Sequence, residues 1–386
     1  MAENTTIPFN RPYLTGRERA YLDEALQSRK LAGDGPFARR CQALMKERFG
    51  SSSVQLTTSC TSALEIAALL CDLDPDDEVI MPSYTFVSTA NAFWLRRAKI
   101  KFVDVRPDTL NIDETQIESA IGPRTRAIVP VHYAGVACDM DEIMSIAAKH
   151  RLAVIEDAAQ GVNATYKGQF LGTIGDMGCY SFHESKNFVA GEAGAFLTNS
   201  ETWAQRAEIV REKGTNRSQF FRGEVDKYTW VDIGSSYIVS DLLAAVLLAQ
   251  LEGMDEITEL RRRAYQRYAA ALSPLVHSGE IRLQKIPQYC GTNFHLFYIL
   301  VEDTRTRIRL IEYLKRLGIH AVFHYVPLHS SPVGEAMGYE AGMLPVTEDC
   351  AGRLVRLPLY AGLQGQEVDR IVDSVHKFFG RSLLKA

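Results

Sequence analysis

The sequence lacks the features that would place a protein in a membrane or on nucleic acid. No apolar run approaches the roughly 18 residues of a membrane span. The first residues show no basic stretch followed by an apolar one, as a secretory signal would. The formal net charge is only -4, so no basic excess favours nucleic acid or a membrane surface. We therefore expect a cytoplasmic protein that contacts neither.

Metal-binding and common nucleotide-binding patterns are also missing. The seven cysteines are scattered, odd in number and without a CxxC pair, which argues against a zinc site and a disulfide framework. There is no GxxxxGK[ST] loop, and no GxGxxG opens a predicted helix after a strand. With 386 residues, 46% of them apolar, we expect a globular protein of two domains without a bound metal.

The apolar pattern predicts an α/β fold. Strands are predicted at 78–81, 100–105, 127–131, 152–155 and 179–182, and helices between them at 86–97, 114–121 and 140–150. Strands separated by helices are typical of a mostly parallel, doubly wound sheet. Ligands bind such sheets at the carboxyl ends of the strands, so the site is expected there.

The pattern changes in the second half of the chain. Residues 242–251 and 254–263 predict a long helix joining a large domain, 1–253, to a small C-terminal domain, 254–386. The elements predicted in the small α+β domain are strands at 296–301 and 320–323 and helices at 306–317 and 367–379.

A run rich in hydroxyl groups, Thr57–Ser62, precedes an apolar helix predicted at 63–70. Serine and threonine are ordinary helix N-caps, so the run can have a purely structural role. The free N–H groups and the positive dipole end of the same helix would also suit a phosphate. The residues alone leave both interpretations open.

Two carboxylates, Glu156 and Asp157, end the strand predicted at 152–155. One or both could cap the helix that follows. Alternatively, one could face a pyridine nitrogen, because an adjacent anion favours the protonated ring that serves as an electron sink. Gln160 lies three residues further on and could hydrogen-bond a ring or substrate oxygen.

Lys186 follows the strand predicted at 179–182. A lysine in such a place is usually a solvated surface charge. Asp157 and Lys186 follow strands of the same predicted sheet, however, so both can reach one crevice. A partly desolvated lysine near other cations becomes nucleophilic and can form a Schiff base. Phe86 is either a core residue or a ring that stacks on a flat cofactor.

These residues, in this order, resemble the DegT/DnrJ/EryC1 family of sugar aminotransferases that depend on pyridoxal 5'-phosphate (PLP). The resemblance extends from Pro8-Phe9-Asn10 to Arg356-Leu357-Pro358-Leu359, and its most specific motifs are EDAAQG and SFHESKN. It implies an aspartate aminotransferase-like fold (fold type I) and a homodimer with its active sites at the subunit interface.

The resemblance also implies the cofactor-binding residues, which are Cys60, Thr61, Phe86, Asp157, Gln160, Ser181 and Lys186. Two of them would be catalytic: Lys186 matches the Schiff-base lysine and Asp157 the partner of the pyridine nitrogen. Gln160 matches the residue beside the cofactor hydroxyl, and Phe86 the ring that stacks on the cofactor. The phosphate cup would comprise Cys60 and Thr61, with Ser181 nearby.

Three further segments, 81–93, 131–141 and 211–237, imply the substrates. They resemble relatives that act in surface polysaccharide biosynthesis. The implied reaction moves an amino group from L-glutamate to C4 of a keto-sugar nucleotide such as dTDP-4-keto-6-deoxyglucose, giving dTDP-4-amino-4,6-dideoxygalactose. A 3-aminotransferase for a 3-keto sugar nucleotide and a non-catalytic PLP-binding regulator stay open. A sugar dehydratase of this fold would carry His in place of Lys186.

The chain departs from the family pattern in two places. Ser236 and Ile238 stand where many relatives have Asn and Arg, and that Asn reaches the partner subunit's cofactor phosphate. Ala193 replaces a glycine, which is tolerable unless the position needs a positive φ. Weaker candidates for holding a nucleotide diphosphate are Arg11, Lys30, Arg217, Arg222 and Tyr325.

Overall fold

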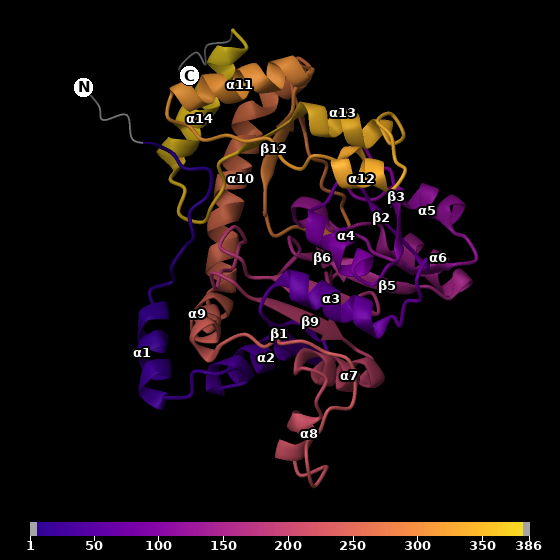
Figure 1. The fold of residues 1–386 in the computed structure, drawn as a ribbon. Helices are drawn as coiled ribbons and strands as arrows, with labels where there is room; N and C mark the ends of the chain where they lie inside the picture. The colour runs from indigo at the N-terminus through magenta and orange to yellow at the C-terminus, as the bar shows by residue number, and fades with distance from the viewer. Residues whose placement is uncertain (1–5, 381–386) are drawn as a thin grey trace.

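Seven strands form the central sheet, in the order β1-β9-β8-β5-β4-β2-β3 (Figure 1). The computed structural model describes residues 6–380. The strands of the central sheet are β1 Ser53–Thr57, β2 Glu78–Pro82, β3 Lys99–Val103, β4 Thr125–Ile128, β5 Ala153–Asp157, β8 Met177–Ser181 and β9 Gly194–Thr198. Neighbouring strands are parallel except β9, which is antiparallel to β1 and β8. The predicted α/β fold with a mostly parallel sheet is confirmed.

Helices cover both faces of this sheet. One face packs against α3 Cys60–Leu70, α4 Val87–Trp94 and α7 Glu201–Arg211. The other packs against α2 Pro36–Phe49, α5 Glu114–Ala120, α6 Met140–His150 and α9 Asp241–Glu252, with α1 Glu18–Ser28 lying on α9. Because side chains alternate along a strand, Val79 and Met81 enter the first core and Ile80 the second.

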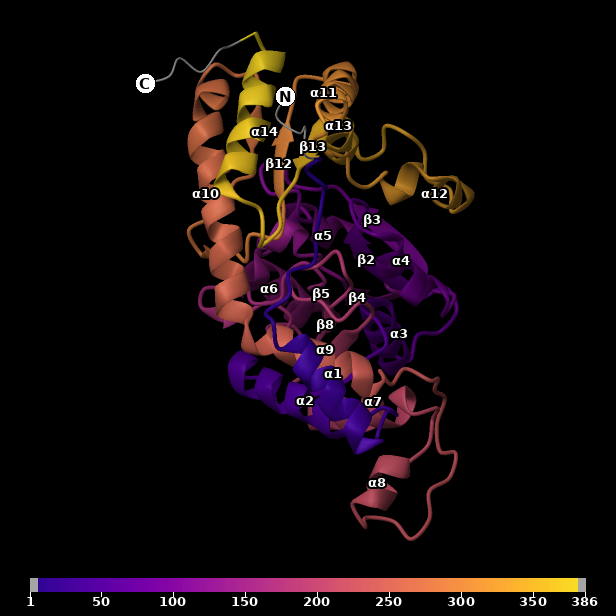
Figure 2. The same cartoon turned by 90° about the vertical axis from the view of Figure 1, so that its left-hand side faces the viewer.

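A second unit is attached through the long helix α10 Met254–His277, which runs upward from α9 in Figure 2. Its antiparallel sheet has the order β10-β12-β13. The strands are β10 Arg282–Leu283, β12 Phe297–Leu300 and β13 Leu354–Leu357, and the helices are α11 Thr304–Arg316, α13 Pro345–Arg353 and α14 Gly365–Phe378. Ile7, near the other end of the chain, bridges to Ile319 and joins this unit's core. The boundary between residues 253 and 254 stays a prediction.

Shorter elements complete the fold. A small sheet of β11-β6-β7 is formed by β6 Thr165–Tyr166, β7 Gln169–Phe170 and β11 Cys290–Gly291. The short helices are α8 Arg217–Phe221 and α12 Pro332–Ala336, and the 3-10 helices are Tyr133–Gly135 and Leu328–Ser330. Among residues 6–380, no helix is both long and apolar enough to cross a membrane.

Most predicted elements are present with shifted ends, but the strand predicted at 320–323 is wrong. There the chain forms only a single bridge, between Val322 and Arg356, before it leaves the sheet edge toward His324 and Tyr325. The pattern also missed β1 and β9, which are strands of five residues each. β9 is buried on both faces and shows no apolar–polar alternation that would mark it. β1 does alternate, from Ser53 to Thr57, so its pattern carried a strand signal.

Glu156 ties the middle of the central sheet to the loop that follows β7. Its fully buried carboxylate accepts hydrogen bonds of 2.7–2.8 Å from three backbone N–H groups within 172–175, and one of 2.8 Å from His132 Nε2. His132 Nδ1 accepts the N–H of Cys138 at 3.2 Å, so the proton of a neutral ring lies on Nε2. Four donors satisfy the buried carboxylate, which therefore serves the fold.

We expect Glu156→Gln to lower the free energy of unfolding by about 2–4 kcal/mol, because the amide would turn its own N–H group against backbone donors. The urea midpoint followed by circular dichroism measures the loss. The exposed Glu340 offers the control Glu340→Gln, which should leave the midpoint unchanged. Equal midpoints for the two variants would contradict this role of Glu156.

Candidate active site

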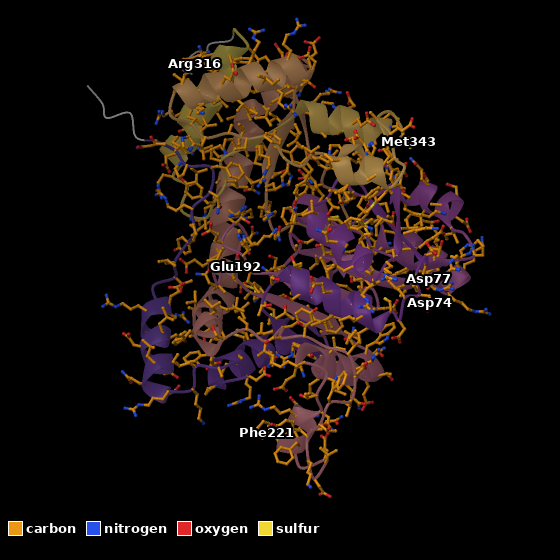
Figure 3. The ribbon with its side chains drawn as sticks, in the orientation of Figure 1. Asp74, Asp77, Glu192, Phe221, Arg316 and Met343 are labelled. Atoms are coloured by element: carbon orange, nitrogen blue, oxygen red, sulfur yellow. The ribbon has the colours of Figure 1, made fainter. Side chains whose placement is uncertain are left out.

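A cavity of about 540 Å³ opens at the carboxyl edge of the central sheet. Its wall includes residues at or just after the ends of β1, β2, β4, β5 and β8 and residues of α3 and α4. Residues of the second unit and of the N-terminal segment complete it. Figure 3 labels one wall residue, Glu192, between the second unit above and the central sheet below. All seven residues named from the sequence line this cavity: Cys60, Thr61, Phe86, Asp157, Gln160, Ser181 and Lys186.

The antiparallel strand β9 brings two parts of the wall together. Thr57 at the end of β1 and Ser181 at the end of β8 both pair with Gly194, the first residue of β9. The start of α3 therefore lies beside the β8–β9 connection, which carries Lys186. A Cβ on Gly194 would lie 2.3 Å from the backbone carbon of Ser59, so this approach requires glycine.

Asp157 lines the cavity, whereas Glu156 points to the opposite face of β5. One oxygen of Asp157 accepts the hydroxyl of Thr89 at 2.7 Å, and the other accepts the N–H of Ala159 at 3.1 Å. These two bonds fix the orientation of the carboxylate. Residues 158–164 form turns, so neither carboxylate caps a helix there.

The side-chain amide of Gln160 is held at both ends. Its Oε1 accepts the backbone N–H of Ala134 at 2.7 Å, and its Nε2 donates to the hydroxyl of Tyr325 at 2.9 Å. These bonds assign the oxygen and nitrogen of the amide, and they leave the second N–H of Nε2 for a ligand. Tyr325 comes from the second unit, so both parts of the chain define this side of the cavity.

Lys186 is no solvated surface charge. Among residues 6–380, its ammonium has no hydrogen-bond or ion-pair partner, and the side chain lines the cavity. Burial lowers the pKa of Lys186; Asp157 opposes this shift and Arg356 adds to it. A lowered pKa raises the neutral fraction of the amine near pH 7, and the neutral amine is the nucleophilic form.

The start of α3 has both a structural N-cap and N–H groups that are free for an anion, the two roles considered from the sequence. Ser59 is the N-cap, and its Oγ accepts the N–H of Ser62 at 3.1 Å. Cys60 and Thr61 follow as the first helical residues and line the cavity. N–H groups in a first helical turn lack acceptors within the helix, so they are available to an anion. Burial raises the pKa of the Cys60 thiol well above its ordinary value, so it adds no negative charge there.

Phe86 does not belong to the core. Its side chain is 57% exposed, and its ring centre lies 6.2 Å from that of Tyr325 across the cavity wall. Ser181, in contrast, is buried at the end of β8, where its Oγ accepts the N–H of His183 at 3.5 Å.

Sequence reasoning missed several wall residues of the cavity, among them four from distant parts of the chain: Phe9, His295, His324 and Arg356. All four come from the second unit or the N-terminal segment, far in sequence from the strands that carry the motifs. One signal was present, because Arg356 interrupts the apolar run of β13.

Of the five weaker candidates, Tyr325 is the one that lines this cavity. Arg217 and Arg222 pair with Glu212 and Glu208 instead, at 2.9 and 2.6 Å. The departures from the family pattern, Ser236 and Ile238, line a different hollow of about 840 Å³. Ala193 is not among the described residues with positive φ, so its methyl group causes no backbone strain.

Comparison with known proteins agrees with this arrangement. Residues 12–376 match the DegT/DnrJ/EryC1/StrS aminotransferase family. The chain belongs to this family. It is 32% identical to the GDP-perosamine synthase of Caulobacter vibrioides, over 97% of this chain and 99% of that one. It is 31% identical to the spore coat polysaccharide biosynthesis protein SpsC of Bacillus subtilis, over 96% and 97% of the two chains.

Solved structures lead to the same family. The aminotransferase TlmJ of Streptoalloteichus hindustanus superposes with a TM-score of 0.90 at 28% identity, covering 97% of this chain and 99% of that one. This protein is therefore a sugar aminotransferase that uses PLP. The cavity fits that cofactor, because it combines an unpaired lysine, a carboxylate held in place and a helix N-terminus.

Proposed function

We propose that the enzyme transfers the amino group of L-glutamate to C4 of a dTDP-4-keto-6-deoxy-hexose, giving dTDP-4-amino-4,6-dideoxygalactose for surface polysaccharide. The observation that carries the proposal is the convergence of Lys186, Asp157 and Gln160 in one cavity. The names of two relatives, GDP-perosamine synthase and SpsC, support a sugar-nucleotide substrate and a role in polysaccharide synthesis. The choice of dTDP and of C4 rests on the segments 81–93, 131–141 and 211–237.

The mechanism assigns a task to each side chain. Bound PLP supplies the electron sink for a carbanion at the donor's α-carbon. Lys186 holds the cofactor through its amine. When an amino donor occupies the site, the freed amine of Lys186 would carry the proton released from the donor's α-carbon, general acid–base work typically worth about 10²–10⁴-fold in rate. Asp157, fixed by Thr89 and by the N–H of Ala159, keeps the ring nitrogen protonated.

The remaining residues position the cofactor. The N–H groups at Cys60 and Thr61 hold its phosphate, with Ser181 nearby. The free N–H of Gln160 would be available to the ring hydroxyl, and Phe86 would cover the ring face. With the keto-sugar bound, Lys186 would deliver the proton to C4 of the sugar.

Two other functions are compatible with the same fold. A 3-aminotransferase would use the same residues on a 3-keto isomer of the sugar. A regulatory role is favoured by another relative, a pleiotropic regulatory protein of Geobacillus stearothermophilus, which is 33% identical over 83% of each chain. The predicted cytoplasmic location stays a prediction.

An amino-transfer assay across a panel of 3-keto and 4-keto sugars linked to dTDP, GDP or UDP tests the substrate. We expect turnover with L-glutamate and the dTDP-linked 4-keto sugar, and NMR should place the new amine at C4 with galacto configuration. An amine at C3 would favour the 3-aminotransferase. A PLP-loaded protein inactive across the panel would favour the regulator.

We expect Lys186→Ala to abolish steady-state turnover while PLP still binds noncovalently, because the lysine is both covalent partner and proton carrier. Borohydride reduction of the unaltered enzyme, digestion and mass spectrometry should place the pyridoxyl group on the peptide that contains Lys186. Lys315→Ala, an exposed change on α11, is the control and should be fully active. A label on another lysine, or an active Lys186→Ala enzyme, would refute the assignment.

We also propose a homodimer with shared active sites. The arm around α8 projects from the molecule (Figures 1 and 2), with Phe221 labelled near its tip in Figure 3. Phe221, Tyr228 and Trp230 are 70%, 54% and 78% exposed, an apolar area that favours burial by a partner. Ser236, which follows this arm, does not line the 540 Å³ cavity of its own chain. The resemblance aligns it with a residue that reaches a partner's cofactor.

Solution scattering should show twice the mass of one chain at micromolar concentration. Trp230→Ser should shift the equilibrium toward monomer and lower activity, because both depend on the same interface. A monomer with full activity per chain would contradict the shared sites.

A further inference from the structure

Besides Lys186, the cavity wall carries a second poorly compensated cation, Arg356. It projects from β13, and its Nε is buried without a hydrogen-bond partner. Among residues 6–380 no carboxylate pairs with it, and its guanidinium lies 4.5 Å from the centre of the Phe9 ring. Burial lowers the pKa of Arg356, although the tyrosines around it oppose this shift. A desolvated cation of this kind is costly unless a ligand supplies the anion.

The other basic groups of the wall are already committed. His183, His295 and His324 each have a ring nitrogen hydrogen-bonded to a neighbouring side chain. Burial lowers the pKa of His295 and of His324 well below the ordinary value, so both rings are neutral near pH 7. Lys186 is assigned to the cofactor. Among the described wall residues, Arg356 therefore remains as the cation for a substrate anion.

A second buried guanidinium strengthens the positive field without competing for a ligand. Arg261, on α10, donates to three backbone carbonyls at 2.6–3.2 Å. Burial, with Arg356 adding, lowers the pKa of Arg261 to about 9. Within the described chain no acidic side chain forms an ion pair with either arginine, so an anion bound at Arg356 would be attracted by both.

The position of Arg356 indicates which anion it binds. It lines the same cavity as Lys186, and its positive charge adds to the lowering of the pKa of that amine. An amino acid whose nitrogen takes the place of the lysine amine has its α-carboxylate only two bonds from that nitrogen. The diphosphate of a sugar nucleotide is separated from the reacting carbon by part of the sugar ring, so it lies further away. The planar guanidinium fork also matches a carboxylate in bidentate geometry.

We propose that Arg356 binds the α-carboxylate of the amino donor, and that the Phe9 ring holds the guanidinium while no donor is bound. The keto-sugar has no carboxylate, so Arg356 returns to the face of Phe9 in the second half of the reaction. Arg356 is thus a specificity residue for the donor half-reaction alone. This inference rests on the proposed use of an amino acid donor, but it does not depend on which sugar is aminated.

The test separates the two half-reactions in purified holoenzyme carrying Arg356→Met. Single-turnover absorbance follows the first half with L-glutamate, and the second half starts from the aminated cofactor and the keto-sugar. We expect the donor half-reaction to slow by at least about 30-fold, as for loss of one partner of a buried charge pair. The sugar half-reaction should change by no more than about twofold. Arg356→Lys, which keeps the charge without the fork, should recover part of the loss.

A binding measurement gives a readout other than activity. Calorimetric titration with glutarate, an unreactive dicarboxylate, should show weakening by at least about 30-fold in Arg356→Met. Phe9→Leu removes the competing ring, so glutarate should bind it about two to five times more tightly than it binds the unaltered enzyme. Weaker binding by Phe9→Leu would refute the role of Phe9.

Arg309→Met is the matched control, because Arg309 lies on α11 with its guanidinium 5.7 Å from the centre of the Phe378 ring and does not line the cavity. It should leave both half-reactions and glutarate binding unchanged. Equal slowing of both half-reactions in Arg356→Met with normal glutarate binding would overturn the proposal, and so would weakened binding of dTDP instead of glutarate. If the proposed sugar is not the substrate, only the second half-reaction will show no turnover. Failure of the proposed sugar can therefore be distinguished from failure of the proposed role of Arg356.

Discussion

Helices cover both faces of the central sheet, so a ligand can reach the sheet only at the ends of the strands. Strands such as β2 and β5 send alternate side chains into two apolar cores, so neither face can carry polar chemistry. Parallel strands place their carboxyl ends at one edge of the sheet. The single antiparallel strand, β9, lets β1 add its own carboxyl end to that edge. The 540 Å³ cavity lies where these constraints coincide.

The same geometry separates two neighbouring carboxylates. Glu156 and Asp157 are adjacent on β5 and therefore point to opposite faces. Glu156 is saturated by four donors and holds a loop, whereas Asp157 receives two and lines the cavity. One strand end thus provides both a structural anchor and an oriented carboxylate in the cavity wall, without competition between them.

The cavity is electrostatically incomplete by itself. Lys186 and Arg356 are cations without ion-pair partners among residues 6–380, and the buried histidines are neutral. The phosphate of PLP and the carboxylate of an amino donor are the anions that such a site lacks. Arg356, which we assign to the donor, comes from the second unit. Lys186, which we assign to the cofactor, follows a strand of the central sheet. Under these assignments, the amino donor and the cofactor would be held by different parts of the fold.

The sequence by itself determined the fold class, and it pointed to seven residues that the structure brings to one cavity. Apolar periodicity and the motifs around Asp157 and Lys186 are local, and parallel strands must bring such residues to one edge. It did not identify Arg356, His295, His324 or Phe9, and it predicted a strand at 320–323 where the chain leaves the sheet. Those residues reach the cavity only because the second unit and the N-terminal segment pack over the sheet edge. Contacts between such distant segments depend on the packing of whole units, which local patterns do not encode; only the tertiary structure decided them.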